Sequence, residues 1–260
     1  MEHTRPFTVI VEGNIGSGKS TFLECFSKYP QEVEVFPEPV AKWRDVRGHN
    51  LFQLMYEDQE RWSMAFQSYA QLTMLELHNQ TTLAPVKIME RSIFSGRHCF
   101  IENLHEEKKM KHSEYTVLCE WFDFLQKSPM FNLKVDLIVY LKTSPEVAFK
   151  RVKQRARSEE KILPIEYLRN LHDLHEKWLH QSTDLPAELV VIEADQNLEQ
   201  NPDMYAQVME KVLAKAQAQR DARKENPRLT KLSLTRPAKT CYPSSPTKVL
   251  GEVNKIAPGQ

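Results

Sequence analysis

The feature that most limits what this chain can fold into is a glycine-rich loop near its amino terminus. The loop fits the pattern G-x-x-x-x-G-K-[ST], and its residues are Gly13, Asn14, Ile15, Gly16, Ser17, Gly18, Lys19 and Ser20. A strand-like run precedes it and a helical pattern follows it, which is the context in which such loops bind phosphate. Main-chain N–H groups of the loop can point at phosphate oxygens, and the helix that follows adds partial positive charge.

The side chains of this loop predict a nucleoside triphosphate and a metal ion as ligands. Lys19 can reach the β- and γ-phosphates, and the hydroxyl of Ser20 can ligate Mg²⁺. Thr21, in the first turn of the helix, completes the predicted phosphate-binding set. A GTPase would need the guanine-reading pattern N-K-x-D, but the nearest string, Asn254-Lys255-Ile256-Ala257, lacks the Asp. The phosphate acceptor therefore has to be sought in other motifs.

Short apolar runs alternate with longer helical patterns along most of the chain. The runs are nearly continuous in Val, Ile and Leu, which is typical of strands covered on both faces. We expect strands at Phe7–Glu12, Val33–Phe36, Val86–Glu90, Val135–Leu141 and Leu189–Glu193. We expect helices at Lys19–Tyr29, Glu60–Gln80, Tyr115–Gln126, Pro145–Arg157, Ile165–His180 and from about Pro202 to Arg220. The alternation predicts an α/β three-layer sandwich, with a parallel sheet of about five strands and helices on both faces.

Composition separates a folded body from a tail. Residues 219–260 hold nine Lys/Arg, three Asp/Glu and five Pro, with few large apolar side chains. We therefore predict a folded domain over residues 1–218 and a basic, disordered tail over residues 219–260. Within this tail, Ser245-Pro246-Thr247-Lys248 fits either a proline-directed phosphorylation site at Ser245 or a plain flexible segment. The formal net charge of the whole chain is zero, so charge indicates neither a nucleic-acid nor a membrane partner.

The cysteines and the amino terminus bear on where the protein works. Cys25, Cys99, Cys119 and Cys241 show neither a C-x-x-C pair nor a zinc-type spacing, which favours free thiols in a reducing compartment. No apolar run approaches the roughly 18 residues that span a bilayer. Only six residues precede the first strand, so we see no signal peptide or mitochondrial presequence. With Met1 as the true start, the expected location is cytoplasmic or nuclear.

Charged side chains follow two of the predicted strands. Glu38 comes after the second strand and precedes Pro39, which favours an extended backbone at the carboxyl edge of the sheet. A carboxylate there could accept a hydroxyl proton, or it could be a solvated strand-end acid. Glu90 and Arg91 end the third strand, where Glu90 could bind Mg²⁺ and Arg91 could neutralise a reacting phosphoryl group. A purely structural ion pair is the alternative for Arg91.

An arginine-rich segment follows the fourth strand. Arg151 and Arg155 share a helix face, Arg157 does not, and no acid appears before Glu159. Placed over a triphosphate, these guanidinium groups would neutralise charge on the transferred group. A nucleic-acid patch is the rival interpretation, but the segment has no interleaved aromatic side chains.

One long helical pattern combines a polar side chain with apolar neighbours. Phe66, Gln67, Ala70 and Met74 fall within about 100° of one another on a helix of 3.6 residues per turn. Gln67 offers a donor and an acceptor side by side, which suits the edge of a nucleobase. A buried glutamine satisfied by the backbone is the common alternative.

Taken together, these motifs resemble the deoxynucleoside kinase family, over about Phe7 to Asp195. The strings that carry the resemblance are residues 11–19 (VEGNIGSGK), 38–43 (EPVAKW), 54–56 (LMY), 66–69 (FQSY), 89–93 (MERSI) and 155–160 (RARSEE). The resemblance implies a P-loop kinase fold with an arginine-rich lid, and ATP and Mg²⁺ as cofactors. It also implies phosphorylation of the 5′-hydroxyl of deoxynucleosides over a broad substrate range, with pyrimidines preferred.

The resemblance further implies a role for each matching residue. Glu38 matches the general base, Arg91 the arginine that positions this base and the 5′ oxygen, and Lys19 the catalytic lysine of the phosphate loop. Gln67 matches the amide that reads the base, and Glu90 stands where some relatives have Asp. The remaining matches are Trp43, Phe66 and Phe100 around the base, Tyr56 and Glu160 at the sugar 3′-hydroxyl, and Arg151, Arg155 and Arg157 in the lid.

Two positions depart from the pattern common in relatives, which often carry Val at Ala70 and Ala at Gly96. With Met74, these smaller residues predict a roomier pocket that accepts purines better than a strict thymidine kinase does. The resemblance also suggests a homodimer formed by a helix pair, and feedback inhibition by a deoxynucleoside triphosphate. Two rivals stay open: a nucleoside monophosphate kinase, which would need more basic residues for its acceptor, and a non-catalytic nucleotide sensor.

Overall fold

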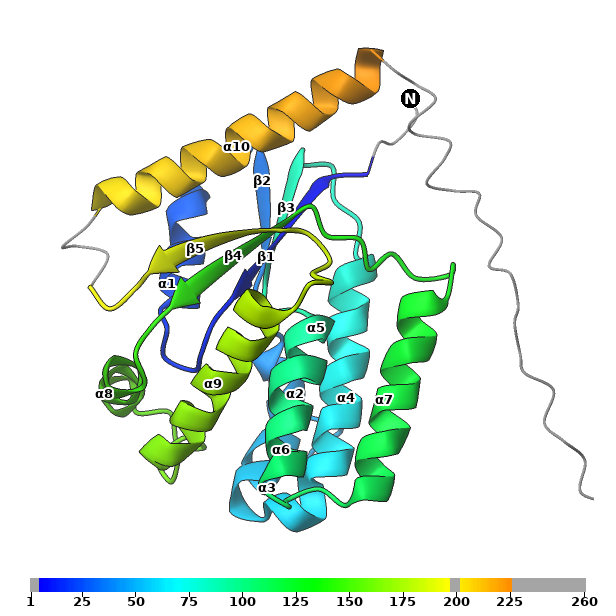
Figure 1. Ribbon diagram of the computed structural model, residues 1–260, viewed down its shortest axis with the longest axis vertical. Coiled ribbons are helices and arrows are strands. Elements are labelled where there is room, and N and C mark those ends of the chain that lie inside the picture. The colour runs from blue at the N-terminus through cyan, green and yellow to red at the C-terminus, as the bar shows by residue number, and fades with distance from the viewer. Residues whose placement is uncertain (1–4, 197–201, 226–260) are drawn as a thin grey trace, which may run out of the picture.

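Strand β1 (Phe7–Glu12) lies at the centre of a parallel sheet with the order β2-β3-β1-β4-β5 (Figure 1). The computed structural model describes residues 5–196 and 202–225. Its other strands are β2 (Val33–Phe36), β3 (Val86–Glu90), β4 (Leu137–Lys142) and β5 (Glu188–Glu193). All four strand pairs in this sheet are parallel, as the alternation of strands and helices predicted.

Alternate residues of the central strands enter two separate hydrophobic cores. On β1, Val9 and Val11 belong to one core and Ile10 to the other. Strand β4 repeats this division, because Val139 packs with the first core and Ile138 with the second. Side chains of a strand point to opposite faces in turn, so a sheet covered on both faces must be apolar at nearly every position. This is why the strands could be recognised as continuous apolar runs.

Within the described residues, two helices cover one face of the sheet and a larger group covers the other (Figure 1). The first group is α1 (Lys19–Glu24), continued by a 3₁₀ turn at Cys25–Lys28, and α10 (Pro202–Glu225). The second group comprises α4 (Gln59–Asn79), α5 (Ile93–Ser95), α7 (His112–Lys127), α8 (Pro145–Arg155) and α9 (Ile165–Gln181). Between and beside them lie α2 (Val40–Arg44), α3 (Leu51–Glu57), a π-helical segment at Gly96–Ile101, and α6 (Glu102–Glu106).

The sandwich predicted from the sequence is confirmed, with differences at several elements. Strands β1, β2 and β3 have the predicted bounds, whereas β4 begins two residues later, at Leu137. The predicted helix at Lys19–Tyr29 is α-helical only to Glu24, and α2, α3, α5, the π-helical segment and α6 were not predicted. These short elements bury few residues, so they carry little periodic signal. None of the helices within the described ranges is long and apolar enough to cross a membrane.

The last helix ends later than the sequence predicted. Helix α10 continues to Glu225, beyond the expected end at Arg220. Its inner face, including Val212 and Ala216, packs against the core beside β1. The rest of the predicted tail, with Cys241 and Ser245, lies outside the described residues. Residues 219–225, which the sequence placed in the tail, therefore belong to helix α10. The disorder expected for residues 226–260 stays a prediction.

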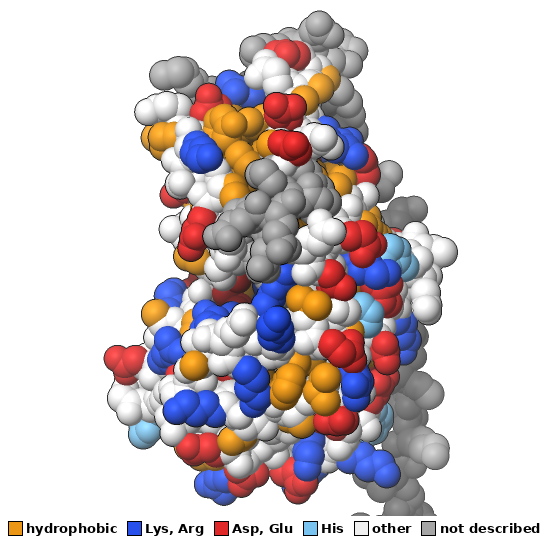
Figure 2. Space-filling view, turned by 90° about the vertical axis from the view of Figure 1, so that its left-hand side faces the viewer, with side chains coloured by type: hydrophobic (Ala, Val, Ile, Leu, Met, Phe, Trp, Pro, Cys, Tyr) orange, Lys and Arg blue, Asp and Glu red, His pale blue; other side chains and the backbone are white. Residues whose placement is uncertain are grey.

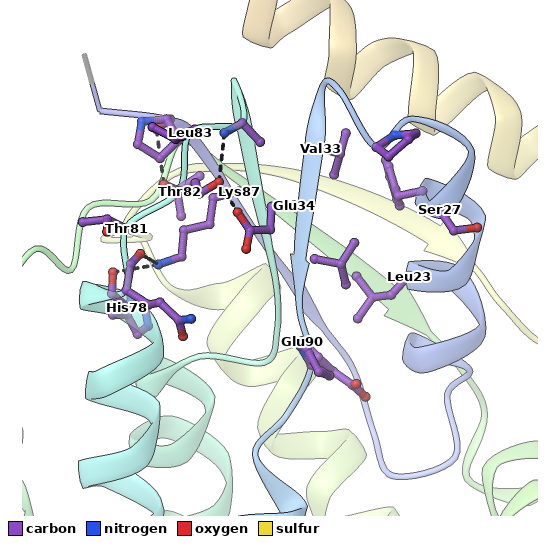
Figure 3. Close-up of a pocket in the computed structure, with 18 of the residues that line it drawn as sticks. Leu23, Ser27, Val33, Glu34, His78, Thr81, Thr82, Leu83, Lys87 and Glu90 are labelled. Atoms are coloured by element: carbon purple, nitrogen blue, oxygen red, sulfur yellow. Dashed lines mark hydrogen bonds between the residues drawn. The ribbon is translucent and has the colours of Figure 1, made fainter. Parts of the chain in front are cut away.

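The carboxyl end of α4 is fixed to the sheet by a buried lysine (Figure 3). Lys87 on β3 is only 2% exposed, and its ammonium donates hydrogen bonds to the carbonyls of Leu77, His78 and Gln80. Carbonyls in the last turn of a helix lack partners within the helix, so a cation there satisfies them and complements the helix dipole. Burial lowers the pKa of Lys87 to about 8. This contact fixes the position of α4, the helix that carries Gln67.

Candidate active site

The glycine-rich loop joins β1 to α1 at the carboxyl edge of the sheet. Gly13 has a φ of +145°, and a Cβ atom there would lie 2.7 Å from the carbonyl oxygen of Leu141. Gly16 has a φ of +80°, and a Cβ atom there would lie 2.5 Å from the carbonyl oxygen of Ala148. Both positions therefore favour glycine for reasons of backbone angle and of space. The loop is consequently pressed closely against β4 and α8.

Lys19 folds back over this loop. Its ammonium donates to the carbonyls of Gly13 and Asn14, at 3.2 and 2.7 Å. Burial, and secondly the neighbouring guanidinium of Arg91, lower the pKa of Lys19 to about 7. An anion placed in the loop would favour the charged ammonium, because an opposite charge nearby stabilises the protonated form. The position of Lys19 is therefore suited to a bound phosphate.

The side chain of Asn14 ties the loop to a distant helix. Its amide nitrogen donates to the carbonyl of Leu168 on α9 at 2.7 Å, and its oxygen accepts from the backbone of Ile15 at 2.8 Å. Asn14 is 2% exposed. The amide is thus engaged within the protein, so a contact of Asn14 with phosphate would have to come from its backbone. The sequence gives no sign of this link, because the two residues are 154 positions apart.

Two oxygen-bearing side chains meet where the loop adjoins β3. The hydroxyl of Ser20 donates to Glu90 Oε1 at 3.0 Å. Hydroxyl and carboxylate oxygens suit Mg²⁺, which commonly keeps several waters and takes further oxygens from substrate phosphates. Across the described residues, no group of three or more His, Cys, Asp or Glu could hold a metal ion by itself. The donor set of Ser20 and Glu90 therefore fits a Mg²⁺ ion shared with a nucleotide.

Glu38 and Arg91 form a nearly buried ion pair beside the loop. Arg91 Nε lies 2.9 Å from Glu38 Oε1, and their side chains are 6% and 17% exposed. The N–H does not point at the oxygen, so the contact is an ion pair rather than a hydrogen bond. Arg91 also donates from Nη1 to the carbonyl of Gly13 at 2.9 Å and lies over the ring of Phe100. Burial raises the pKa of Glu38, and the charge of Arg91 partly offsets this.

Beneath Arg91 lies a buried acid that the sequence reasoning did not single out. Glu12, the last residue of β1, is fully buried and accepts a hydrogen bond from Ser92 Oγ at 2.5 Å. Ser92 Oγ in turn accepts from the backbone of Phe94 at 3.1 Å and caps α5. Burial raises the pKa of Glu12 to about 7. A Glu at the end of an otherwise apolar central strand was the signal that could have identified it.

A slot for the acceptor opens next to this ion pair. The predicted substrate residues are brought together, because one pocket is lined by Glu38, Trp43, Tyr56, Phe66, Gln67, Ala70, Met74, Arg91, Gly96, Phe100 and Glu160. The sequence reasoning missed Phe52, Met55, Arg97 and Tyr167, which also line it. The free space in the slot is about 80 Å³, less than the several hundred Å³ common for ligand pockets.

Within this slot, Gln67 differs from the usual buried glutamine. It is 4% exposed, and its amide makes no hydrogen bond within residues 5–196 and 202–225. Trp43 beside it donates to Thr73 Oγ1 at 2.8 Å, and the rings of Trp43 and Phe66 meet edge to face at 5.4 Å. The amide of Gln67 lines the slot and accepts or donates no side-chain hydrogen bond among the described residues, so it is available to a polar ligand.

The arginines of the predicted lid border the phosphate loop. Arg155 and Arg157 both contact Glu160, at 2.5 and 3.3 Å, and α8 ends at Arg155, so Arg157 lies outside the helix. Arg151 donates to the carbonyl of Ala194 after β5 at 2.8 Å. All three arginines line a hollow shared with the loop residues from Gly16 to Thr21. On the face of the molecule in Figure 2, basic side chains are interspersed with acidic ones.

A groove larger than the slot runs along the edge strand β2 (Figure 3). It has a volume of about 1420 Å³ and reaches from Leu83 to Glu90. Lys87 within it already donates to three carbonyls, so its charge is engaged. Ser20 and Glu90 also line this groove, which therefore adjoins the glycine-rich loop, but none of the predicted substrate-binding residues lines it.

Comparisons with known proteins show what this chain is similar to. A family model described as deoxynucleoside kinase matches residues 9–216. The chain is 47% identical over 214 residues to human thymidine kinase 2, mitochondrial, covering 82% of this chain and 80% of that protein. It is 37% identical over 238 residues to human deoxycytidine kinase, covering 81% and 91%, and 35% identical over 235 residues to deoxycytidine kinase 1 of Xenopus laevis, covering 78% and 88%.

Proposed function

The chain belongs to the deoxynucleoside kinase family, and we propose that Glu38 and Arg91 form the centre at which it phosphorylates the 5′-hydroxyl of a deoxynucleoside. ATP is the phosphate donor of this family, and the product is a deoxynucleoside monophosphate. The observation that carries the proposal is the 2.9 Å ion pair of Glu38 and Arg91, which stands between the phosphate loop and the acceptor slot. A general base must lie within reach of the proton that it removes.

The proposed reaction is an in-line transfer. The 5′ oxygen forms a bond to the γ-phosphorus while the bond from that phosphorus to the β,γ-bridging oxygen breaks, so ADP leaves. The 5′-hydroxyl proton passes to a carboxylate oxygen of Glu38. Arg91 holds this carboxylate and, with Arg155 and Arg157, faces the charge that develops on the transferred group.

Residues of the loop would hold the donor. Main-chain N–H groups from Gly13 to Ser20 would bind the phosphates, and Lys19 would lie against the β- and γ-phosphates. Ser20 and Glu90 would hold Mg²⁺, which neutralises phosphate charge when bound. Their 3.0 Å hydrogen bond supports this assignment, because it brings both oxygens to one point at the mouth of the loop.

Recognition of the nucleoside rests on a few polar groups in an apolar slot. Gln67 is proposed to read the base edge, with Trp43, Phe66 and Phe100 against its ring. Tyr56 and Glu160 are proposed to bind the sugar 3′-hydroxyl. Burial raises the pKa of Tyr56 well above its usual value, so its hydroxyl stays a hydrogen-bond donor.

The alternatives are less well supported by the side chains. A nucleoside monophosphate kinase would bring a second phosphate group against the carboxylate of Glu38, and like charges at this distance repel. A non-catalytic sensor would not need a carboxylate and an arginine paired at the 5′ end of the slot. The cytoplasmic or nuclear location stays a prediction, and the human relative is named as mitochondrial.

We further propose that a second copy of this chain packs against α4 and α7, which contact each other in the fold (Figure 1). Large apolar side chains are exposed there: Leu72, Val117, Trp121 and Phe124 are between 45% and 56% exposed. The last three are spaced at helical intervals on α7, so they share one face. Exposed apolar side chains gathered on one face are typical of interfaces.

The dimer is tested by mass in solution. We expect sedimentation analysis at micromolar concentration to give twice the chain mass of 30.4 kDa. Trp121→Glu should shift the protein toward the single-chain mass, because a charge would be buried without a partner. A single-chain mass for the wild type would contradict the proposed pairing.

The base role of Glu38 is tested by Glu38→Gln. Thymidine binding measured by calorimetry should persist, whereas kcat should fall about 100-fold or more, because the amide cannot accept the proton. The raised pKa of Glu38 means that kcat/KM of the wild type should fall as the pH falls through that value. The variant should lack this acid limb. Undiminished turnover in Glu38→Gln would remove Glu38 from the base role.

The size of the slot is tested with four substrates. A Cβ atom at Gly96 would meet nothing within 4 Å, so this position leaves space beside the base. We expect measurable kcat/KM for deoxyadenosine and deoxyguanosine, besides thymidine and deoxycytidine. Gly96→Ala should lower the purine values about tenfold, with thymidine, the internal control, changed less. Purine values near background in the wild type would contradict the prediction.

A further inference from the structure

Two adjacent acids, Glu159 and Glu160, lie between the acceptor slot and the lid. Their side chains are 4% and 2% exposed, so both carboxylates are almost wholly buried. Glu160 is held by the lid, through Arg155 and Arg157. Glu159 is held from the other side, by Arg44 at the end of α2. The two acids therefore lie between helix α2 on one side and the lid arginines on the other, and each side forms ion pairs with one of them.

The contact between Arg44 and Glu159 is a bidentate one. Arg44 Nε donates to Glu159 Oε1 at 2.7 Å, and Nη2 donates to Oε2 at 2.9 Å. Ser158 adds a third hydrogen bond to Glu159, at 3.1 Å. Two parallel bonds between a guanidinium and a carboxylate fix the relative orientation of both groups. Glu159 is buried while the side chain of Arg44 is 42% exposed, so the pair lies at the edge of the buried region, where its bidentate geometry distinguishes it from an ordinary surface ion pair.

The position of Arg44 links this contact to the acceptor. Helix α2 begins at Val40, two residues after Glu38, and its Trp43 lines the slot beside Arg44. Glu159 is joined through one peptide bond to Glu160, which lines the same slot. The ion pair of Arg44 and Glu159 therefore connects the segment that contains Glu38, the proposed base, with the segment that contains Glu160, the proposed sugar contact.

We propose that Arg44 is a positioning residue, which acts through Glu159 to hold Glu160 and the lid arginines over the acceptor slot. This inference rests on the proposed binding of the sugar 3′-hydroxyl by Glu160. Without Arg44, the carboxylate of Glu159 would be buried with no opposite charge, which is costly. The segment 158–160 would relieve that cost by turning toward water, and Glu160 would leave its place in the slot. Arg44 thus affects substrate choice although it does not line the slot.

The test compares thymidine with 3′-deoxythymidine, which lacks the hydroxyl that Glu160 is proposed to bind. We expect the wild type to have a higher kcat/KM for thymidine than for 3′-deoxythymidine. In Arg44→Glu, the ratio of these two values should fall about tenfold. The charge-swapped double variant Arg44→Glu/Glu159→Arg should recover much of it, because the ion pair is restored with its sign reversed. Arg47→Glu is the matched control: Arg47 is exposed near the end of α2, makes no ion pair among the described residues, and should leave the preference unchanged.

Several outcomes would overturn the inference. A purely structural role predicts a lower melting temperature for Arg44→Glu, with the preference for thymidine intact. A double variant no better than Arg44→Glu would show that the ion pair is not what acts. Equal use of both substrates by the wild type would refute the role of Glu160, and this inference with it. That result would appear before any variant is made, so it can be distinguished from a result that refutes only the role of Arg44. Glu159→Gln, which buries no charge, serves as a milder variant if the double variant does not fold.

Discussion

The arrangement of the site depends on Arg91, which contacts three partners. Arg91 meets the carboxylate of Glu38, donates to the carbonyl of Gly13, and lies over the ring of Phe100. Its backbone has a φ of +62°, an unfavourable conformation for a residue with a side chain. The strand beside it maintains that conformation, because the N–H of Arg91 donates to Val11 and Ser92 is bonded to Glu12. Donor loop and acceptor slot are thereby held at one fixed separation.

The parallel sheet explains why these groups meet. Carboxyl ends of β1, β2 and β3 lie along one edge, so the residues that follow each strand converge there. The phosphate loop follows β1, Glu38 follows β2, and Arg91 follows β3. The helices supply the remaining parts: α4, anchored at its end by Lys87, carries Gln67, and the lid follows β4. The proposed site residues thus come from several elements, which the sheet and the helices packed on it bring together.

The sequence predicted the parts of this site that depend on local pattern. The glycine-rich loop, the acids after β2 and β3, and Gln67 on its helix face are recognisable because motif spacing and periodicity place them. The contacts between distant segments were not predicted: Asn14 with Leu168, Glu12 with Ser92, and Arg44 with Glu159. Such pairs are decided by packing in three dimensions and leave no periodic trace in one sequence. Arg151 was expected in the lid, and its bond to the carbonyl of Ala194 became apparent only in the fold.

The proposed reaction requires that the carboxylate of Glu38 lie at the 5′ end of a nucleoside whose base contacts Gln67. A crystal structure with thymidine and ADP bound would test it most directly. We expect a carboxylate oxygen of Glu38 within about 2.6–3.2 Å of the 5′ oxygen, and the amide of Gln67 within hydrogen-bond distance of the base edge. A bound thymidine out of reach of both side chains would contradict it.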